Sequence, residues 1–205
     1  MGGERRLLAV SAGVGILLFL AGMAVFLGGY HAIDVTVEGY VLRNASPRLD
    51  TWVVALTGLG NPPVALAMTA AMALFCLWRC GRREAAYAFT AVLSTMVLVS
   101  ALKMLFGRER PGSAVLEVAS HAFPSWHAAV AMALAATAAI LMFRHARRAT
   151  RFAPLLALWP LAIGFTRVYL RVHWLSDVVA GWGAGLAVPA LMGLIWFSGG
   201  RRGDS

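Results

Sequence analysis

Charged residues are scarce in this sequence. Only 13% of its 205 residues are charged and 60% are hydrophobic, whereas soluble domains average roughly 25% charged and about 45–50% apolar residues. This deficit argues against a soluble domain and indicates a membrane protein. Acidic residues are the scarcer kind, because 9 Asp and Glu stand against 18 Lys and Arg and leave a net charge of +9.

Cysteine is almost absent as well. The two cysteines, Cys76 and Cys80, lie four residues apart, a spacing that suits one packing face of a helix. Two thiolates alone make a poor metal site, and the basic residues nearby place this segment in the cytoplasm, where thiols stay reduced. We therefore expect two free cysteines that serve packing.

Long hydrophobic runs, by contrast, fill the chain. Six are long enough, or nearly so, to cross a hydrocarbon core of about 30 Å, which takes roughly 20 helical residues. They cover residues 7–28, 51–78, 85–102, 126–143, 152–169 and 178–197. We predict an all-α polytopic membrane protein, with six transmembrane helices in one bundle and a single domain over residues 1–205. The first run exceeds the roughly 7–15 residues of a signal-peptide core and lacks a clear cleavage site, so we interpret it as a retained span.

The connections refine this layout. Residues 29–50 mix apolar and charged side chains and are predicted to include a short helix along the membrane interface. The sequence Gly-Asn-Pro-Pro interrupts the second run, so its span is expected to begin at Pro62 or Pro63, which suit a first helical turn. Gly181 and Gly185 are four residues apart in the last run and predict a close helix approach.

The basic residues predict the orientation of the chain. Four clusters fall on one side of a six-span protein: Arg5 and Arg6; Arg79, Arg82 and Arg83; Arg144, Arg147, Arg148 and Arg151; Arg201 and Arg202. The connections on the other side carry mixed charge. The positive-inside rule therefore places both termini in the cytoplasm, with the chain in the cell (inner or plasma) membrane. Because topology accounts for the basic residues, no nucleic-acid partner is needed to explain them.

Three polar segments lie on the extracytoplasmic side in this arrangement. They read KMLFGRERP from residue 103, HAFPSWHAA from residue 121 and TRVYLRVHWLSD from residue 166. Taken singly, each has an ordinary structural explanation. Lys103 would reach the interface at a span end, Ser125 would cap a helix, and Trp126 and Trp174 would belong to an aromatic belt.

Taken together, the three segments predict an anion site. Lys103, Arg110 and Arg167 suit phosphate oxygens, with Arg108 or Arg171 as a further candidate. Ser125 and the first amides of the fourth span would donate to the same anion, since a helix N-terminus favours negative charge.

The same segments carry proton-transfer groups. His173 and Asp177 are four residues apart, so on a helix they would share a face and the carboxylate would orient the imidazole. The other ring nitrogen would then be free to attack phosphorus, with His127 as the general acid for the departing oxygen. Two histidines and one aspartate are also possible metal ligands, but converging cations disfavour a divalent metal, and we predict neither a metal nor another cofactor.

The three segments resemble the signature of the type 2 phosphatidic acid phosphatase superfamily, which includes bacterial phosphatidylglycerophosphate and undecaprenyl pyrophosphate phosphatases. Its pattern is Lys, six residues, Arg-Pro; then Pro-Ser-Gly-His; then Ser-Arg, five residues, His, three residues, Asp. The chain has Lys103, Arg110-Pro111, Pro124-Ser125-Trp126-His127, Thr166-Arg167, His173 and Asp177 at these spacings. Two positions depart from it, since Trp126 replaces glycine and Thr166 replaces the usual serine.

The resemblance implies a role for each matching residue. His173 would form a phosphohistidine, Asp177 would orient it, and His127 would protonate the leaving group and later activate water. The phosphoryl oxygens would be bound by Lys103, Arg110, Ser125, the backbone amide of Trp126 and Arg167, with no metal required. The tryptophan ring would line the lipid entry route or narrow the pocket. No role in the family pattern falls to Arg171.

The resulting hypothesis is a membrane lipid phosphatase whose partners are the bilayer and a lipid phosphate or pyrophosphate. Undecaprenyl pyrophosphate, phosphatidylglycerophosphate and phosphatidate are all candidate substrates. Two alternatives stay open: a phosphotransferase with an acceptor other than water, and a non-enzymatic lipid or anion transporter. The sequence does not specify the oligomeric state.

Overall fold

The computed structural model describes residues 2–28 and 31–197, and this part of the chain is mainly helical, without a strand. Its helices are α1 (Gly2–Leu27), α2 (His31–Asn44), α3 (Pro47–Thr57), α4 (Pro62–Arg79), α5 (Arg82–Phe106), α6 (Trp126–His145), α7 (Ala153–Tyr169) and α8 (Leu175–Trp196), with short 3₁₀ segments at Gly58–Gly60 and Arg147–Phe152. The predicted basic pair Arg201 and Arg202 lies outside the described residues.

Six helical segments are long and apolar enough to cross a membrane, which confirms the predicted all-α six-span fold. They are α1, α4, α5, α6, Thr150–Tyr169 and α8. The second span begins at Pro62, as predicted, because the two prolines occupy the first turn of α4. The ends of α5 extend beyond the predicted 85–102 in both directions, since charged residues can continue a helix past the hydrocarbon core.

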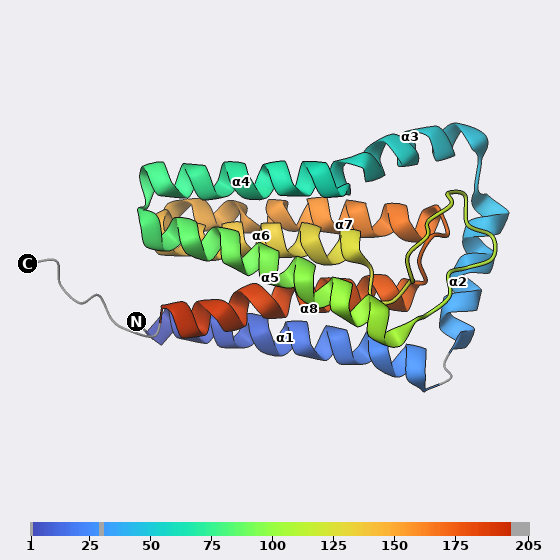
Figure 1. The fold of residues 1–205 in the computed structure, drawn as a ribbon, viewed down its shortest axis with the longest axis horizontal. Helices are drawn as coiled ribbons and strands as arrows, with labels where there is room; N and C mark the ends of the chain where they lie inside the picture. Colours follow the sequence, from blue (N-terminus) through green and yellow to red (C-terminus); the bar gives the residue numbers. More distant parts are fainter. Residues whose placement is uncertain (1, 29–30, 198–205) are drawn as a thin grey trace, which may run out of the picture.

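The connection at residues 29–50, which was predicted to include a short interfacial helix, contains α2 and the start of α3. Figure 1 shows α2 lying across one end of the bundle and α3 leading from it towards α4. Ser46 separates the two helices because its Oγ accepts from the amide of Leu49 at 3.3 Å, with Pro47 in the first turn. The long connection between α5 and α6 lies beside α2 at the same end (Figure 1).

Close packing of α6 on α8 sets the geometry at this end. A Cβ atom on Gly181 would lie 2.6 Å from the carbonyl oxygen of Ser125, and one on Gly185 would lie 2.2 Å from that of Ala129. Only glycine permits this separation, so the predicted close approach is confirmed. It allows the amide of Ser125 to donate to the backbone oxygen of Asp177 at 2.9 Å.

The two ends of the bundle differ in charge and in hydrogen bonding. Successive spans run in opposite directions, so the described basic clusters lie at the end of the bundle where the chain begins. The three polar segments lie at the other end, beside α2 (Figure 1). Between the ends, large apolar side chains such as Leu17, Leu74 and Ile195 are 67%, 65% and 79% exposed. Such a surface suits contact with lipid rather than water.

Candidate active site

Four span ends meet around a cavity of about 560 Å³. Contributions come from the start of α4, the end of α5, the start of α6 and the end of α7. Six of the predicted site residues line it, namely Lys103, Arg110, Trp126, His127, Arg167 and His173. The other two, Ser125 and Asp177, are fully buried. Ser125 precedes Trp126 in the chain, and Asp177 contacts His173.

The contact between His173 and Asp177 forms in a way that the sequence did not predict. His173 precedes α8, in the turn after α7, so the two residues are not one turn apart on a helix. Trp174 is the N-cap of α8, and its amide donates to Asp177 Oδ2 at 2.9 Å. This capping bond turns the carboxylate back along the chain, where Oδ2 lies 3.4 Å from His173 Nδ1.

The surroundings of His173 define its protonation state. Its Nε2 lies 3.2 Å from Arg110 Nη1, which can only donate, so Nε2 carries the lone pair and Nδ1 carries the proton facing Asp177. Burial first, and then the charges of Lys103, Arg110 and Arg167, hold the pKa of His173 well below its usual value. The ring is therefore a neutral, oriented imidazole whose Nε2 lone pair faces Arg110 on the cavity side.

Backbone oxygens of residues 120–122 accept hydrogen bonds from two of the cations around the cavity. Lys103 Nζ donates to the carbonyls of His121 at 2.5 Å and Ala122 at 3.2 Å. Arg110 donates to the carbonyls of Ser120 at 2.8 Å and His121 at 3.2 Å. Neutral carbonyls position these cations without cancelling their charge, so the cavity stays attractive to an anion.

Two buried donors near the cavity have no partner among the described residues. They are the Oγ of Ser125 and the Nε of Arg167, whose Nη1 donates to Thr57 Oγ1 at 2.8 Å. Ser125 occupies the N-cap position of α6 but makes no capping bond with its side chain. Buried polar groups are usually paired, so these two donors are available to an anion beside the N-terminus of α6.

Arg108 and Arg171, the further candidates for anion binding, point elsewhere. Arg108 forms ion pairs with Asp177 at 2.5 Å and with Asp34 at 2.8 Å. Arg171, with φ of 55°, donates to the backbone oxygens of Ser113 at 3.0 Å and Tyr169 at 3.4 Å. Both guanidinium groups are thus directed towards other acceptors, and neither residue lines the cavity.

Three contacts of the site were missed from sequence. His127 Nε2 lies 3.1 Å from Asn61 Oδ1, Thr57 holds Arg167, and Asp34 holds Arg108. Asn61 and Thr57 flank the break between α3 and α4, where the prolines drew attention to the turn and not to its polar side chains. Among the described residues, no group of three or more His, Cys, Asp and Glu side chains is placed to hold a metal ion.

Comparison with known proteins identifies the family. A family model of the PAP2 superfamily matches residues 84–199, which is more than half of the chain. This chain belongs to the PAP2 superfamily. The match contains all eight predicted site residues, whereas Asp34, Thr57 and Asn61 lie before it.

Two solved structures share the PAP2 fold with this chain. The first, described as the first transmembrane PAP2 type phosphatidylglycerolphosphate phosphatase from Bacillus subtilis, superposes with a TM-score of 0.81 at 18% identity, over 94% of this chain and 98% of that one. The second, LpxE from Aquifex aeolicus, gives a TM-score of 0.62 at 22% identity, over 78% of this chain and 94% of that one. The fold is therefore that of a membrane PAP2 phosphatase.

Trp126 stands where the PAP2 signature has glycine, and the backbone tolerates it. Arg171 is the only described non-glycine residue with positive φ, so Trp126 adopts a conformation open to any residue. Its ring lines the cavity and packs against the cluster that includes Val130 and Leu134. The indole therefore forms part of the apolar wall of the cavity.

Proposed function

We propose that this PAP2 protein is a lipid phosphatase that transfers a phosphoryl group first to His173 and then to water. The observation that carries the proposal is the state of His173. Its Nδ1 faces Asp177 and its Nε2 lone pair faces a cavity lined by Lys103, Arg110 and Arg167. An oriented nucleophile among uncompensated cations fits attack on a phosphate better than binding alone.

In the first step, Nε2 of His173 attacks phosphorus as the bond to the leaving oxygen breaks, and His127 gives that oxygen a proton. Lys103, Arg110, Arg167 and Ser125, with the amide of Trp126, hold the charge that develops on the phosphoryl oxygens. In the second step, His127 takes a proton from water, whose oxygen attacks the phosphohistidine. Inorganic phosphate leaves and His173 recovers its lone pair.

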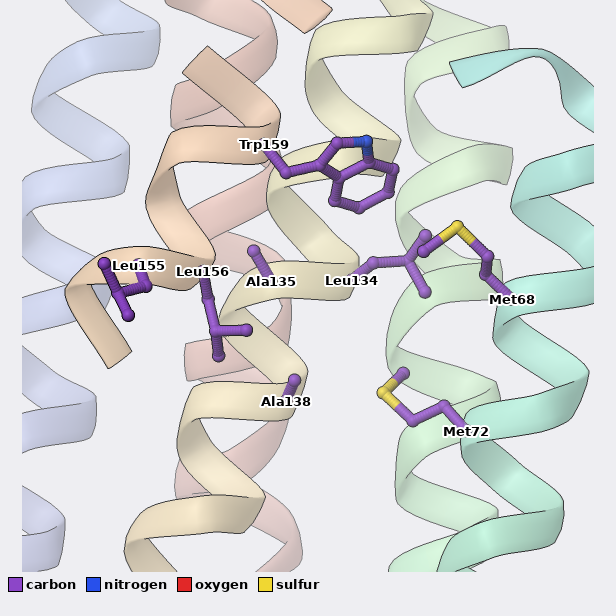
Figure 2. Close-up of a pocket in the computed structure, with 8 residues that line it drawn as sticks. All are labelled: Met68, Met72, Leu134, Ala135, Ala138, Leu155, Leu156 and Trp159. Carbon is purple, nitrogen blue, oxygen red and sulfur yellow. The ribbon is translucent and has the colours of Figure 1, made fainter. Parts of the chain in front are cut away.

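A second cavity supports a lipid as the substrate. Figure 2 shows it between α4, α6 and α7, with a volume of about 330 Å³ and walls that include Met68, Leu134, Ala138 and Trp159. On α6, Leu134 belongs to the hydrophobic cluster against which Trp126 packs, and Ala138 follows Leu134 one helical turn later. At 1.5 Å per residue they lie roughly 12 to 18 Å deeper in the membrane, where the chain of a bound lipid phosphate would extend.

These features fit a phosphate attached to a long acyl or prenyl chain. Undecaprenyl pyrophosphate, phosphatidylglycerophosphate and phosphatidate share this chemistry and are the candidate substrates. The described basic clusters at the opposite end support an orientation with both termini in the cytoplasm of the cell membrane. The proposed site then faces the extracytoplasmic leaflet.

The test is phosphate release by the purified protein from a panel of these lipids in detergent, with and without a chelator. We expect hydrolysis that resists the chelator and an acid-labile phosphoenzyme whose label lies on His173. No release from any lipid phosphate would refute the phosphatase, and loss of activity with chelator would refute the metal-free mechanism. Label that passes from the phosphoenzyme to a lipid acceptor, and not to water, would establish a phosphotransferase instead.

A further inference from the structure

Asp34 is a charged residue buried in the first turn of α2, with 1% of its surface exposed. A buried carboxylate is costly unless it is paired, and this one is fully engaged. Its Oδ2 accepts from Arg108 Nη2 at 2.8 Å and from Ser176 Oγ at 2.6 Å, and its Oδ1 accepts from the amide of Ser176 at 2.9 Å. Asp34 therefore ties α2 to the first turn of α8, next to Asp177.

Arg108 connects this carboxylate to the proposed catalytic pair. Its Nη1 donates to Asp177 Oδ1 at 2.5 Å and to Ser176 Oγ at 2.7 Å. The guanidinium carbon lies 4.7 Å from the ring centre of Phe26 and 5.5 Å from that of Trp174. With both ends paired and two aromatic rings beside it, the guanidinium holds one orientation.

The two oxygens of Asp177 are thereby divided between two tasks. Arg108 holds Oδ1, and Oδ2 is left for the amide of Trp174 and for His173. Rotation of the carboxylate would break the contact with Arg108, so the arginine determines which way Oδ2 points. The ring orientation of His173 depends on that direction.

The charges of Asp34, Arg108 and Asp177 also support a link between Asp34 and the proposed catalytic pair. One guanidinium is shared by two carboxylates, so Asp34 takes up part of the positive charge that would otherwise fall on Asp177 alone. Asp177 then keeps more of its negative charge towards His173, whose ring gains positive charge as Nε2 forms the bond to phosphorus. We propose that Asp34 is a positioning residue that acts through Arg108 to orient Asp177 and maintain its charge. This inference rests on the proposed phosphatase function.

Asp34 could instead serve only to anchor α2 to the bundle. Glu38 provides a control for this purely structural role. Glu38 lies on the same helix and accepts from Ser113 Oγ at 2.5 Å. It therefore ties α2 to the α5–α6 connection, and its only hydrogen bond in the described structure is to Ser113. Asp34→Asn and Glu38→Gln remove the same charge from the same helix, but only the first change reaches Asp177.

The experiment compares the two variants with the wild type for thermal unfolding and for kinetics on the best lipid phosphate. Asp34→Asn should lower kcat by about tenfold or more, as expected for a residue behind an orienting group, and should change KM by less than about twofold. Phosphoenzyme formation in a single turnover should slow by the same factor as kcat. Glu38→Gln should keep kcat within about twofold of the wild type even where both variants unfold at lower temperature.

Ser176→Ala provides a milder second variant, since it removes the hydroxyl between Asp34 and Arg108 and leaves both charges in place. A several-fold loss of kcat with unchanged KM is the expected result, and it keeps the test decisive if Asp34→Asn does not fold. Wild-type kcat in Asp34→Asn, or equal kcat losses in Asp34→Asn and Glu38→Gln, would overturn the positioning role while the phosphatase stands. A wild-type protein without phosphatase activity would overturn both.

Discussion

Replacing Gly181 by alanine should damage both the stability and the activity of this protein. The added Cβ would lie 2.6 Å from the carbonyl oxygen of Ser125, whereas ordinary contacts begin at 3.4 Å. Backbone cannot yield as a side chain does, so α6 and α8 must move apart by several tenths of an ångström. Overpacking of this kind costs about 1–3 kcal/mol, or roughly 2–4 °C in Tm per kcal/mol for a chain of this size.

This separation of α6 from α8 would occur next to the proposed site. The amide of Ser125 donates to the backbone oxygen of Asp177 at 2.9 Å, and this bond joins the start of α6 to the start of α8. Since a misplacement of about 1 Å can cost 100-fold in rate, half that shift should lower kcat on the order of tenfold.

The assay measures Tm and kcat on a lipid phosphate for Gly181→Ala, with Gly13→Ala as the matched control. Gly13 is also a helical glycine, but a Cβ there meets nothing within 4 Å, so alanine should be neutral or slightly stabilising. The reasoning fails if Gly181→Ala keeps the Tm and kcat of the wild type, or if both variants lose the same amount.

Three further predictions concern the proposed site and its surroundings. His173→Ala should abolish turnover and the phosphoenzyme, and Asp177→Asn should lower kcat by roughly 10³- to 10⁴-fold; turnover by His173→Ala would remove the proposed nucleophile. Ala138→Phe should fill the cavity of Figure 2 and lower kcat/KM for long-chain lipid phosphates several-fold more than for short-chain ones, and an equal effect on both would argue against a chain site. The pKa of His173 is held below its unfolded value of about 6.5, so acid protonates this histidine in the unfolded chain first. Stability present above that pH should be lost as the pH falls through it, and the Tm of His173→Gln should depend less steeply on pH than that of the wild type.

Much of the fold could be predicted because the relevant signals are local. A run of about 20 apolar residues must form a helix in a membrane whatever its neighbours are, so the six spans followed from composition alone. Pro62 and Trp126 begin their helices as predicted, since prolines in a first turn and a serine before a helix act within a few residues. The close approach at Gly181 was also predicted, because two glycines one turn apart present a smooth helix face.

For the candidate site, the sequence could predict which residues come together but not how they contact one another. Lys103, Arg110, Trp126, His127, Arg167 and His173 meet at one cavity, as expected for polar residues at helix ends on one side of a six-span chain. The contact of His173 with Asp177 was expected from a helical turn but forms through the N-cap of α8. Spacing in sequence does not distinguish these two geometries, because both place residues four apart within hydrogen-bonding reach.

By itself, the sequence determined the membrane class, the number of spans and the set of polar residues gathered at one end. Each depends on hydropathy or on motifs within a few residues. Only the tertiary structure decided which partners those residues take. Arg108 pairs with Asp34, 74 residues away, because α2 lies across the end of the bundle, and no local signal specifies where a helix outside the membrane will settle. Ion pairing acts over a few ångströms in space and is indifferent to distance along the chain, so the network behind His173 emerges only from the folded protein.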